Sequence, residues 1–124
     1  MTAAYWCVLF AALMPIIWSG VAKGGAPGFD NARPRVYLAA VQGWRQRANW
    51  AQQNAWEAFA PFAAGVLVAS QVGVPQTTID RLAGVFMGAR ILHGVFYIAE
   101  MATLRSLVYT VGLLCTVGLF IAGA

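Results

Sequence analysis

YWCVLFAALMPIIWSGVA, residues 5–22, is the stretch that decides the fold, because it holds no charged side chain. A helix needs about 20 mostly apolar residues to cross the hydrocarbon core of a bilayer. Pro15 lies within the stretch, and membrane helices tolerate proline. The stretch therefore predicts a transmembrane helix near the start of the chain. No Lys or Arg precedes it and no small-residue cleavage site is evident, so we do not expect a cleaved signal peptide.

Three further apolar stretches follow, at residues 55–74, 82–99 and 107–122. Of the 124 residues, 60% are hydrophobic and only 10% are charged, whereas soluble domains are about 25% charged. A soluble chain of this length would lack the polar surface to cover such a core. We find no internal repeat, and we expect residues 1–124 to form one domain. The sequence predicts an all-α integral membrane protein, a bundle of four transmembrane helices surrounded by membrane lipids.

The three connections between the predicted spans differ in length. Residues 23–46 form the longest, in which Pro34 suits the first turn of a helix. We expect that helix to run unbroken into the second span and to project beyond the hydrocarbon. The second connection is a short turn, where Thr77 or Thr78 would cap the third helix. The last connection, near residues 100–105, is very short.

The net charge of +4 carries information about topology. Cytoplasmic connections of membrane proteins are enriched in Lys and Arg. That rule places the first and third connections in the cytoplasm and both termini outside it. A nucleic-acid partner is not expected, because it would need a solvated basic face. The basic residues of the two connections are Lys23, Arg33, Arg35, Arg45, Arg47 and Arg105, with only Arg81 on the other side.

The two cysteines, Cys7 and Cys115, lie within apolar stretches. Neither has a second Cys or a His at the spacing of metal ligands. Cysteine is readily buried as a small hydrophobic residue. We therefore expect both to pack in the core, and we predict no metal site.

Polar side chains within the predicted spans are the strongest functional signal. A charged side chain at the centre of a membrane helix costs about 2.5–3.5 kcal/mol. Arg47, Asn54 and Glu57 are spaced by seven and three residues, which places them on one side of a helix. They fall near the cytoplasmic end of the second span.

The third and fourth spans carry polar groups near the same leaflet. These groups are Arg90, His93 and Tyr97 on the third span, and Arg105, Ser106 and Tyr109 on the fourth. Three helices with such groups at one depth predict a polar cavity open to the cytoplasm. Counting one arginine from each of these three groups against Glu57 leaves a formal excess of +2. An anionic ligand would balance that excess.

Each of these residues also has a purely structural explanation. Glu57 could pair with Arg90 only to satisfy a buried charge. Asn54 could hydrogen-bond between helices, and His93 could be an interior histidine with its partners satisfied. Interfacial or solvated positions would equally explain Tyr97, Tyr109, Arg45 and Arg47.

Together, these residues resemble the MAPEG family, the membrane-associated proteins in eicosanoid and glutathione metabolism. One segment is similar to the family's signature on its second helix, and another resembles the bacterial branch of the family. Two further segments are similar to the prostaglandin E synthase and glutathione transferase pattern. The second-helix signature is Arg47-Ala48-x-x-Ala51-x-x-Asn54-x-x-Glu57, and the bacterial-branch segment is Asp30-Asn31-x-x-Pro34-Arg35. The two segments similar to the synthase and transferase pattern are Arg90-x-x-His93-x-x-x-Tyr97 and Arg105-Ser106-x-x-Tyr109.

The resemblance implies a homotrimer in a bacterial inner membrane, with glutathione as co-substrate bound between neighbouring subunits on the cytoplasmic side. Arg105 would face the thiol, with Ser106 and Tyr109 beside it. Lys23 is the candidate for a basic residue that a neighbouring subunit contributes. The implied glutathione-binding residues are Arg47, Asn54, Glu57, Arg90, His93 and Tyr97. This sequence departs from glutathione-using members at Trp50 and Gln53, where they carry arginines, and at Ala58, where some carry tyrosine.

Two main functions follow from these expectations. The first is a glutathione-dependent transferase or peroxidase that acts on lipophilic electrophiles, with the thiolate stabilised by Arg105. The second is a non-catalytic membrane scaffold, or an accessory subunit of a larger complex. Transport is a weaker third interpretation, because the charged groups cluster in one leaflet whereas a pathway needs polar positions through the midplane.

Overall fold

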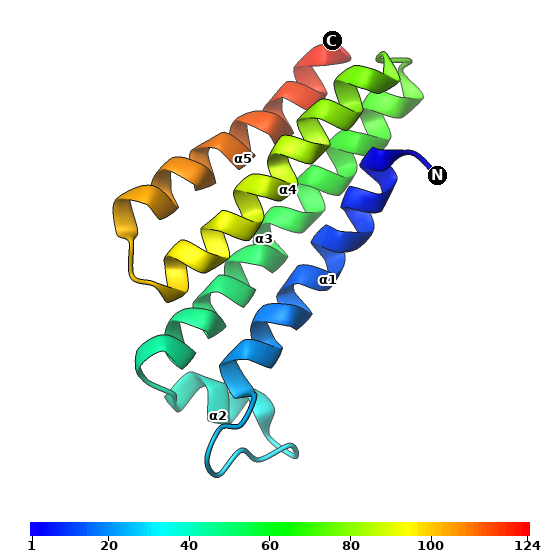
Figure 1. The fold of residues 1–124 in the computed structure, drawn as a ribbon. Coiled ribbons are helices and arrows are strands. Elements are labelled where there is room, and N and C mark those ends of the chain that lie inside the picture. The colour runs from blue at the N-terminus through cyan, green and yellow to red at the C-terminus, as the bar shows by residue number, and fades with distance from the viewer.

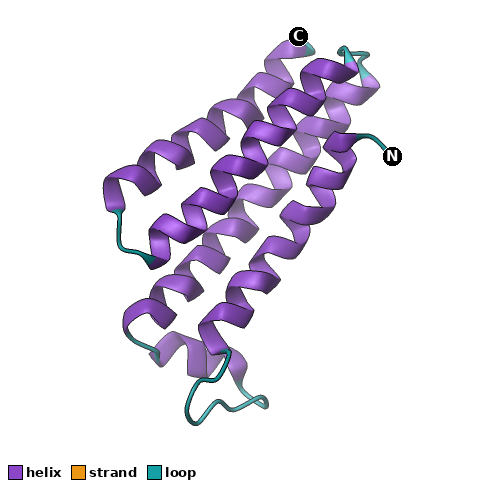
Figure 2. Cartoon of the chain, in the orientation of Figure 1, coloured by secondary structure: helices purple, strands orange, loops and turns teal.

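The computed structural model describes residues 1–124 as five helices with no strand (Figure 2). Four long helices run side by side, and one short helix lies at the end of the bundle opposite both termini (Figure 1). Each of the four predicted spans overlaps one long helix, although the second span extends three residues beyond the end of α3 and the third extends one residue beyond the end of α4. Two of these, α1 and α5, are long and apolar enough to cross a membrane by length and composition. The helices are α1 (Ala3–Lys23), α2 (Pro34–Ala40), α3 (Gly43–Gln71), α4 (Gln76–Ile98) and α5 (Ala102–Ala122).

Side chains from elsewhere in the chain satisfy both ends of α1. At its start, Thr2 accepts a hydrogen bond from the Tyr5 backbone N–H over 3.2 Å. At its end, Arg45 donates from Nη1 to the carbonyl oxygens of Ala22 (3.1 Å) and Gly24 (2.9 Å). The last carbonyls of a helix lack partners within the helix and carry partial negative charge. Arg45 is therefore a helix cap rather than a freely solvated marker of topology.

The expectation of one unbroken helix from Pro34 into the second span is wrong. The short helix α2 ends at Ala40, the next two residues are extended, and Gly43 opens α3 with φ +66°. A positive φ is readily available to glycine because it has no Cβ. The break folds α2 back against α3, where Asn49 donates from Nδ2 to the Leu38 carbonyl over 3.3 Å. The helix α3 is still about 43 Å long at 1.5 Å per residue, which exceeds a hydrocarbon core of about 30 Å.

The start of α4 also differs from the expectation, because neither Thr77 nor Thr78 caps it. The helix begins at Gln76 without a side-chain cap. Asp80, one turn further on, accepts hydrogen bonds from Gln76 Nε2 (2.8 Å) and from the Ala4 backbone N–H (2.9 Å). A carboxylate on α4 thus satisfies an otherwise free N–H at the start of α1. This contact fixes the two helices relative to each other at the end where the termini lie.

The core lies between the four long helices. Phe62 of α3 and Phe86 of α4 stack face to face, with ring centroids 3.8 Å apart and planes 5° from parallel. Cys115 is buried in this core and Cys7 packs against it, both as free thiols, which confirms the expectation for the cysteines. Gly94 lets α4 approach α1 closely, because a Cβ at this position would overlap the Trp18 indole.

Substituting Gly94→Ala should therefore destabilise the bundle by about 1–3 kcal/mol, the usual cost of overpacking. Gly20→Ala is the matched control, because a Cβ at that helical glycine meets nothing within 4 Å. Alanine in an open helical position should leave stability unchanged or raise it. Thermal unfolding in detergent, followed by circular dichroism, compares the two variants. Equal melting temperatures would contradict the close contact of α1 and α4.

Candidate functional site

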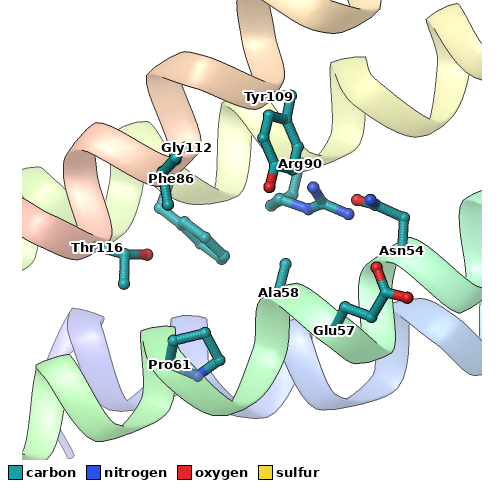
Figure 3. Close-up of a pocket in the computed structure, with 10 residues that line it drawn as sticks. Asn54, Glu57, Ala58, Pro61, Phe86, Arg90, Tyr109, Gly112 and Thr116 are labelled. Carbon is teal, nitrogen blue, oxygen red and sulfur yellow. The ribbon is translucent and has the colours of Figure 1, made fainter.

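A cavity of about 100 Å³ opens between α3, α4 and α5. One end is polar and the other is apolar, as Figure 3 shows, with the Asn54 amide, the Glu57 carboxylate and the Arg90 guanidinium gathered together. The polar end is lined by Asn54, Glu57, Arg90 and Tyr109, and the rest of the cavity by Ala58, Pro61, Phe86, Gly112, Leu113 and Thr116. The structure thus brings together four residues that the sequence singled out, from three different helices.

Arg90 is the buried charge of this cavity. Its side chain is only 4% exposed, yet it makes no hydrogen bond and no ion pair with the rest of the chain. In particular, no oxygen of Glu57 lies within 4.0 Å of it, so the two do not form a salt bridge. Burying an ion costs several kcal/mol, which a nearby partner normally offsets. An anionic group in the cavity would supply that partner.

Two hydrogen-bond acceptors beside Arg90 also lack partners. Asn54 Oδ1 is buried and receives no hydrogen bond, although buried polar atoms are nearly always paired. Glu57 is exposed at the same face of α3 and pairs with no cation. An unpartnered acceptor, an unpaired carboxylate and an unpaired guanidinium together suit a ligand that carries an N–H donor, an ammonium and a carboxylate.

His93 lies at the centre of an aromatic cluster next to the cavity. It is only 2% exposed, and its ring centroid lies 5.5 Å from that of Tyr97 and 6.1 Å from that of Tyr109. Its Nδ1 atom is buried without a hydrogen-bond partner. His93 therefore packs between the two tyrosines, but it is not the interior histidine with satisfied partners that the sequence allowed, because its Nδ1 atom is unpaired.

Arg105 lies beside the cavity rather than within it. Its guanidinium carbon is 4.5 Å from the centroid of the Tyr97 ring, a cation–π contact. Tyr97 in turn shares an open depression with Trp50, Asn54 and Glu57. Asn54 and Glu57 line both this depression and the cavity, so the two spaces adjoin at these residues.

Besides His93, Tyr97 and Arg105, three more predicted residues do not line the cavity. Arg47 donates from Nε to the Ile98 carbonyl over 2.9 Å, and its Nη1 lies 3.9 Å from Glu100 Oε2. It therefore satisfies the carboxyl end of α4 and does not add to the positive charge of the cavity. Ser106 is exposed, and its hydroxyl makes no hydrogen bond. Lys23 lines a different cavity, at the end of α1.

Sequence reasoning missed the apolar part of the cavity, formed by Pro61, Phe86, Leu113 and Thr116. Thr116 is the one of these with a readable signal, since it is a polar residue inside an apolar span. It also missed that Trp50 packs against Tyr97, with ring centroids 6.3 Å apart. Neither the apolar lining of the cavity nor the packing of Trp50 on Tyr97 follows from residue spacing within one helix, because both join different helices.

Substituting Arg90→Met should stabilise the ligand-free protein, by about 1 kcal/mol, because a buried charge without a partner is replaced by an apolar chain. Arg47→Met is the matched control. It removes a hydrogen bond and an ion pair and should lower stability by about 1 kcal/mol. Thermal unfolding in detergent without added ligand compares the two, and equal destabilisation would show that Arg90 has a compensating partner.

Comparison with known proteins adds one match. The model of the MAPEG family matches residues 3–124, which is nearly the whole chain. Searches of curated proteins and of solved structures gave no significant match. The family is membrane-associated and includes both glutathione-dependent transferases and non-catalytic members. With its apolar helices and a family match over almost its full length, the chain belongs to the MAPEG family.

Proposed function

We propose that this protein is a glutathione-dependent membrane enzyme that acts on lipophilic electrophiles. The observation that supports this most strongly is the buried Arg90 guanidinium without a counter-ion, beside the unpartnered Asn54 Oδ1 and the unpaired Glu57. Glutathione carries two carboxylates, an ammonium and two peptide N–H groups. Arg90 would hold a carboxylate, Asn54 would accept from a peptide N–H, and Glu57 would hold the ammonium.

Arg105 supplies the chemistry in this proposal. A free thiol has a pKa near 8.5, and only its thiolate is a strong nucleophile. An arginine guanidinium offers a delocalised positive charge and several N–H donors, and that of Arg105 lies over the ring of Tyr97, which lines the depression beside the cavity. A cation beside the sulfur stabilises the thiolate by about 1.4 kcal/mol for each unit of pKa. Tyr109, which lines the cavity, would donate to the oxygen of the electrophile.

The apolar end of the cavity indicates the class of electrophile. Pro61, Phe86 and Leu113 would receive the hydrocarbon part of a lipophilic compound, which reaches the site from the bilayer. The thiolate sulfur forms a bond to the electrophilic carbon, and the electron pair of the broken bond leaves with the displaced group or moves onto a carbonyl oxygen. With a lipid hydroperoxide, the sulfur would instead attack the terminal oxygen, so that the O–O bond breaks, the lipid leaves as its alcohol and the sulfur becomes a sulfenic acid. A second glutathione thiol would then displace water from the sulfenic acid and form glutathione disulfide.

The same proposal includes four transmembrane helices in a homotrimer. All four long helices extend along one axis, and the basic connections lie at the end opposite both termini (Figure 1). The positive-inside rule then places those connections in the cytoplasm. Glu57 is exposed on a single chain at membrane depth, which a neighbouring subunit would cover. The bacterial inner membrane follows from the resemblance of residues 30–35 to the bacterial branch.

A non-catalytic role is the second candidate, favoured by one observation. Trp50 packs on Tyr97, and neutral Gln53 lines the same depression, where glutathione-using members carry arginines. A membrane scaffold would keep the fold and need no anion site there. Two observations would favour the non-catalytic role. They are partners that co-purify in stoichiometric amounts and a thermal stability that glutathione does not change.

Glutathione binding to the detergent-solubilised protein tests the site. The wild-type protein should bind at millimolar concentration or below, and Asn54→Ala should weaken binding about 2- to 10-fold through the loss of one hydrogen bond. Gln71→Ala, at the other end of α3, is the matched control and should bind like the wild type. Calorimetric titration measures all three. A wild-type protein that does not bind would rule out the proposed enzyme.

Arg105→Leu should lower the thiolate fraction of bound glutathione at pH 7 about tenfold or more, because one unit of pKa corresponds to one such factor. Arg105→Lys keeps the charge and should retain part of the thiolate, and Arg81→Leu, at the opposite end of the bundle, should retain all of it. Ultraviolet absorbance of the thiolate gives the fraction directly. Unchanged absorbance and turnover in Arg105→Leu would contradict the role of this arginine.

A further inference from the structure

Another and larger cavity lies at the α2 end of the bundle, on a different face of α3. It has a volume of about 450 Å³ and is enclosed by α1, α2 and α3. None of the residues around it is acidic, and it shares no residue with the cavity at Arg90. The polar and aromatic residues that line it are Ser19, Lys23, Arg35, Gln52, Gln53 and Trp56.

The two cations of this cavity have no acidic partner. Arg35 makes neither a hydrogen bond nor an ion pair, and Lys23 only lies over the Phe29 ring, with Nζ 5.4 Å from the centroid. Lys23 sits at the end of α1 but does not cap it, because Arg45 already occupies the carbonyls there. Both charges are therefore available to an anion.

Hydrogen bonds within the chain already hold the residues at the base of the cavity in place without a ligand. Asn49 donates to the Leu38 carbonyl, and Gln52 donates from Nε2 to Asn49 Oδ1 over 2.8 Å. Leu38 is buried against Ala22 and Ala48, which holds α2 on the bundle. The donors that remain free are the hydroxyl of Ser19 and the amide of Gln53, since neither makes a hydrogen bond within the chain. These donors suit phosphate oxygens.

The position of the cavity along the bundle matches lipid headgroups. Lys23 ends the apolar helix α1, and Trp56, which is 51% exposed at the rim, is a residue typical of the membrane interface. Ile16 lies one turn before Ser19 on the same side of α1 and is 59% exposed. An acyl chain can therefore lie along α1 below the cavity.

We propose that the cavity between α1, α2 and α3 binds the phosphate of an anionic phospholipid at the cytoplasmic surface. Lys23 and Arg35 neutralise the phosphate, Ser19 and Gln53 donate hydrogen bonds to it, and the acyl chains run along the exposed apolar face of α1. This cavity shares no residue with the cavity at Arg90 and meets the depression beside Trp50 and Tyr97 only at Gln53, so its occupation by a lipid does not depend on thiol chemistry.

Native mass spectrometry of the protein released from detergent micelles tests this, with phosphatidylglycerol and phosphatidylcholine as probes. Phosphatidylglycerol should bind more tightly than phosphatidylcholine. Lys23→Gln and Arg35→Gln should each weaken its binding about fivefold, and the double variant about 30-fold, from about 1 kcal/mol for each cation near a membrane surface. Arg33→Gln is the matched control, because Arg33 belongs to the same connection but does not line the cavity.

Two competitors identify the source of the phosphate group. Millimolar inorganic phosphate should not displace the lipid, because it has no chains to contact α1; displacement would assign the cavity to free phosphate instead. Glutathione should not displace it either, and displacement would show that Lys23 belongs to the thiol site. Equal binding of the two lipids, or cation variants that bind like Arg33→Gln, would overturn the proposal. Glutathione binding by Arg35→Gln should stay at the wild-type level.

Discussion

The buried guanidinium of Arg90 is the constraint on which the rest of the site depends. It lies among α3, α4 and α5 without a counter-ion, although the stacked Phe62 and Phe86 rings pack the core nearby. Such an arrangement is costly in the ligand-free protein, and a bound anion would offset that cost. The polar groups around it, Asn54 and Glu57, are likewise unpaired. In the function proposed here, the site is organised for a ligand at the expense of stability.

The cations at the α2 end of the bundle divide into two kinds. Arg45 and Arg47 donate to backbone carbonyls at the ends of α1 and α4, so they stabilise the fold. Lys23 and Arg35 have no acidic partner and line an open cavity. Charge counted along the sequence does not separate these kinds, but hydrogen bonding does. The same end of the molecule therefore combines capped helix termini with charges that are free to bind anions.

Periodicity within single helices predicted much of this structure, and contacts between helices explain what it missed. Spacing placed Asn54 and Glu57 on one side of α3, and both line the cavity. Arg47 shares that spacing, but it lies about 10 Å from Asn54 along the helix axis. There it donates a hydrogen bond to the Ile98 carbonyl at the end of α4. The break before Gly43 could have been predicted, because the glycine itself is a local signal. The hydrogen bond from the Ala4 N–H to Asp80 could not, because it joins residues far apart in sequence.

In the proposed site, Asn54 and Arg90 interact not with each other but with a shared anionic ligand. A double-mutant cycle of Asn54→Ala and Arg90→Met, measured as free energy of unfolding with and without saturating glutathione, tests it most directly. The effects of the two substitutions should be additive in the ligand-free protein and should show a coupling energy of about 1 kcal/mol or more when glutathione is bound. Coupling of the same size without ligand, or additive effects in both states, would contradict it.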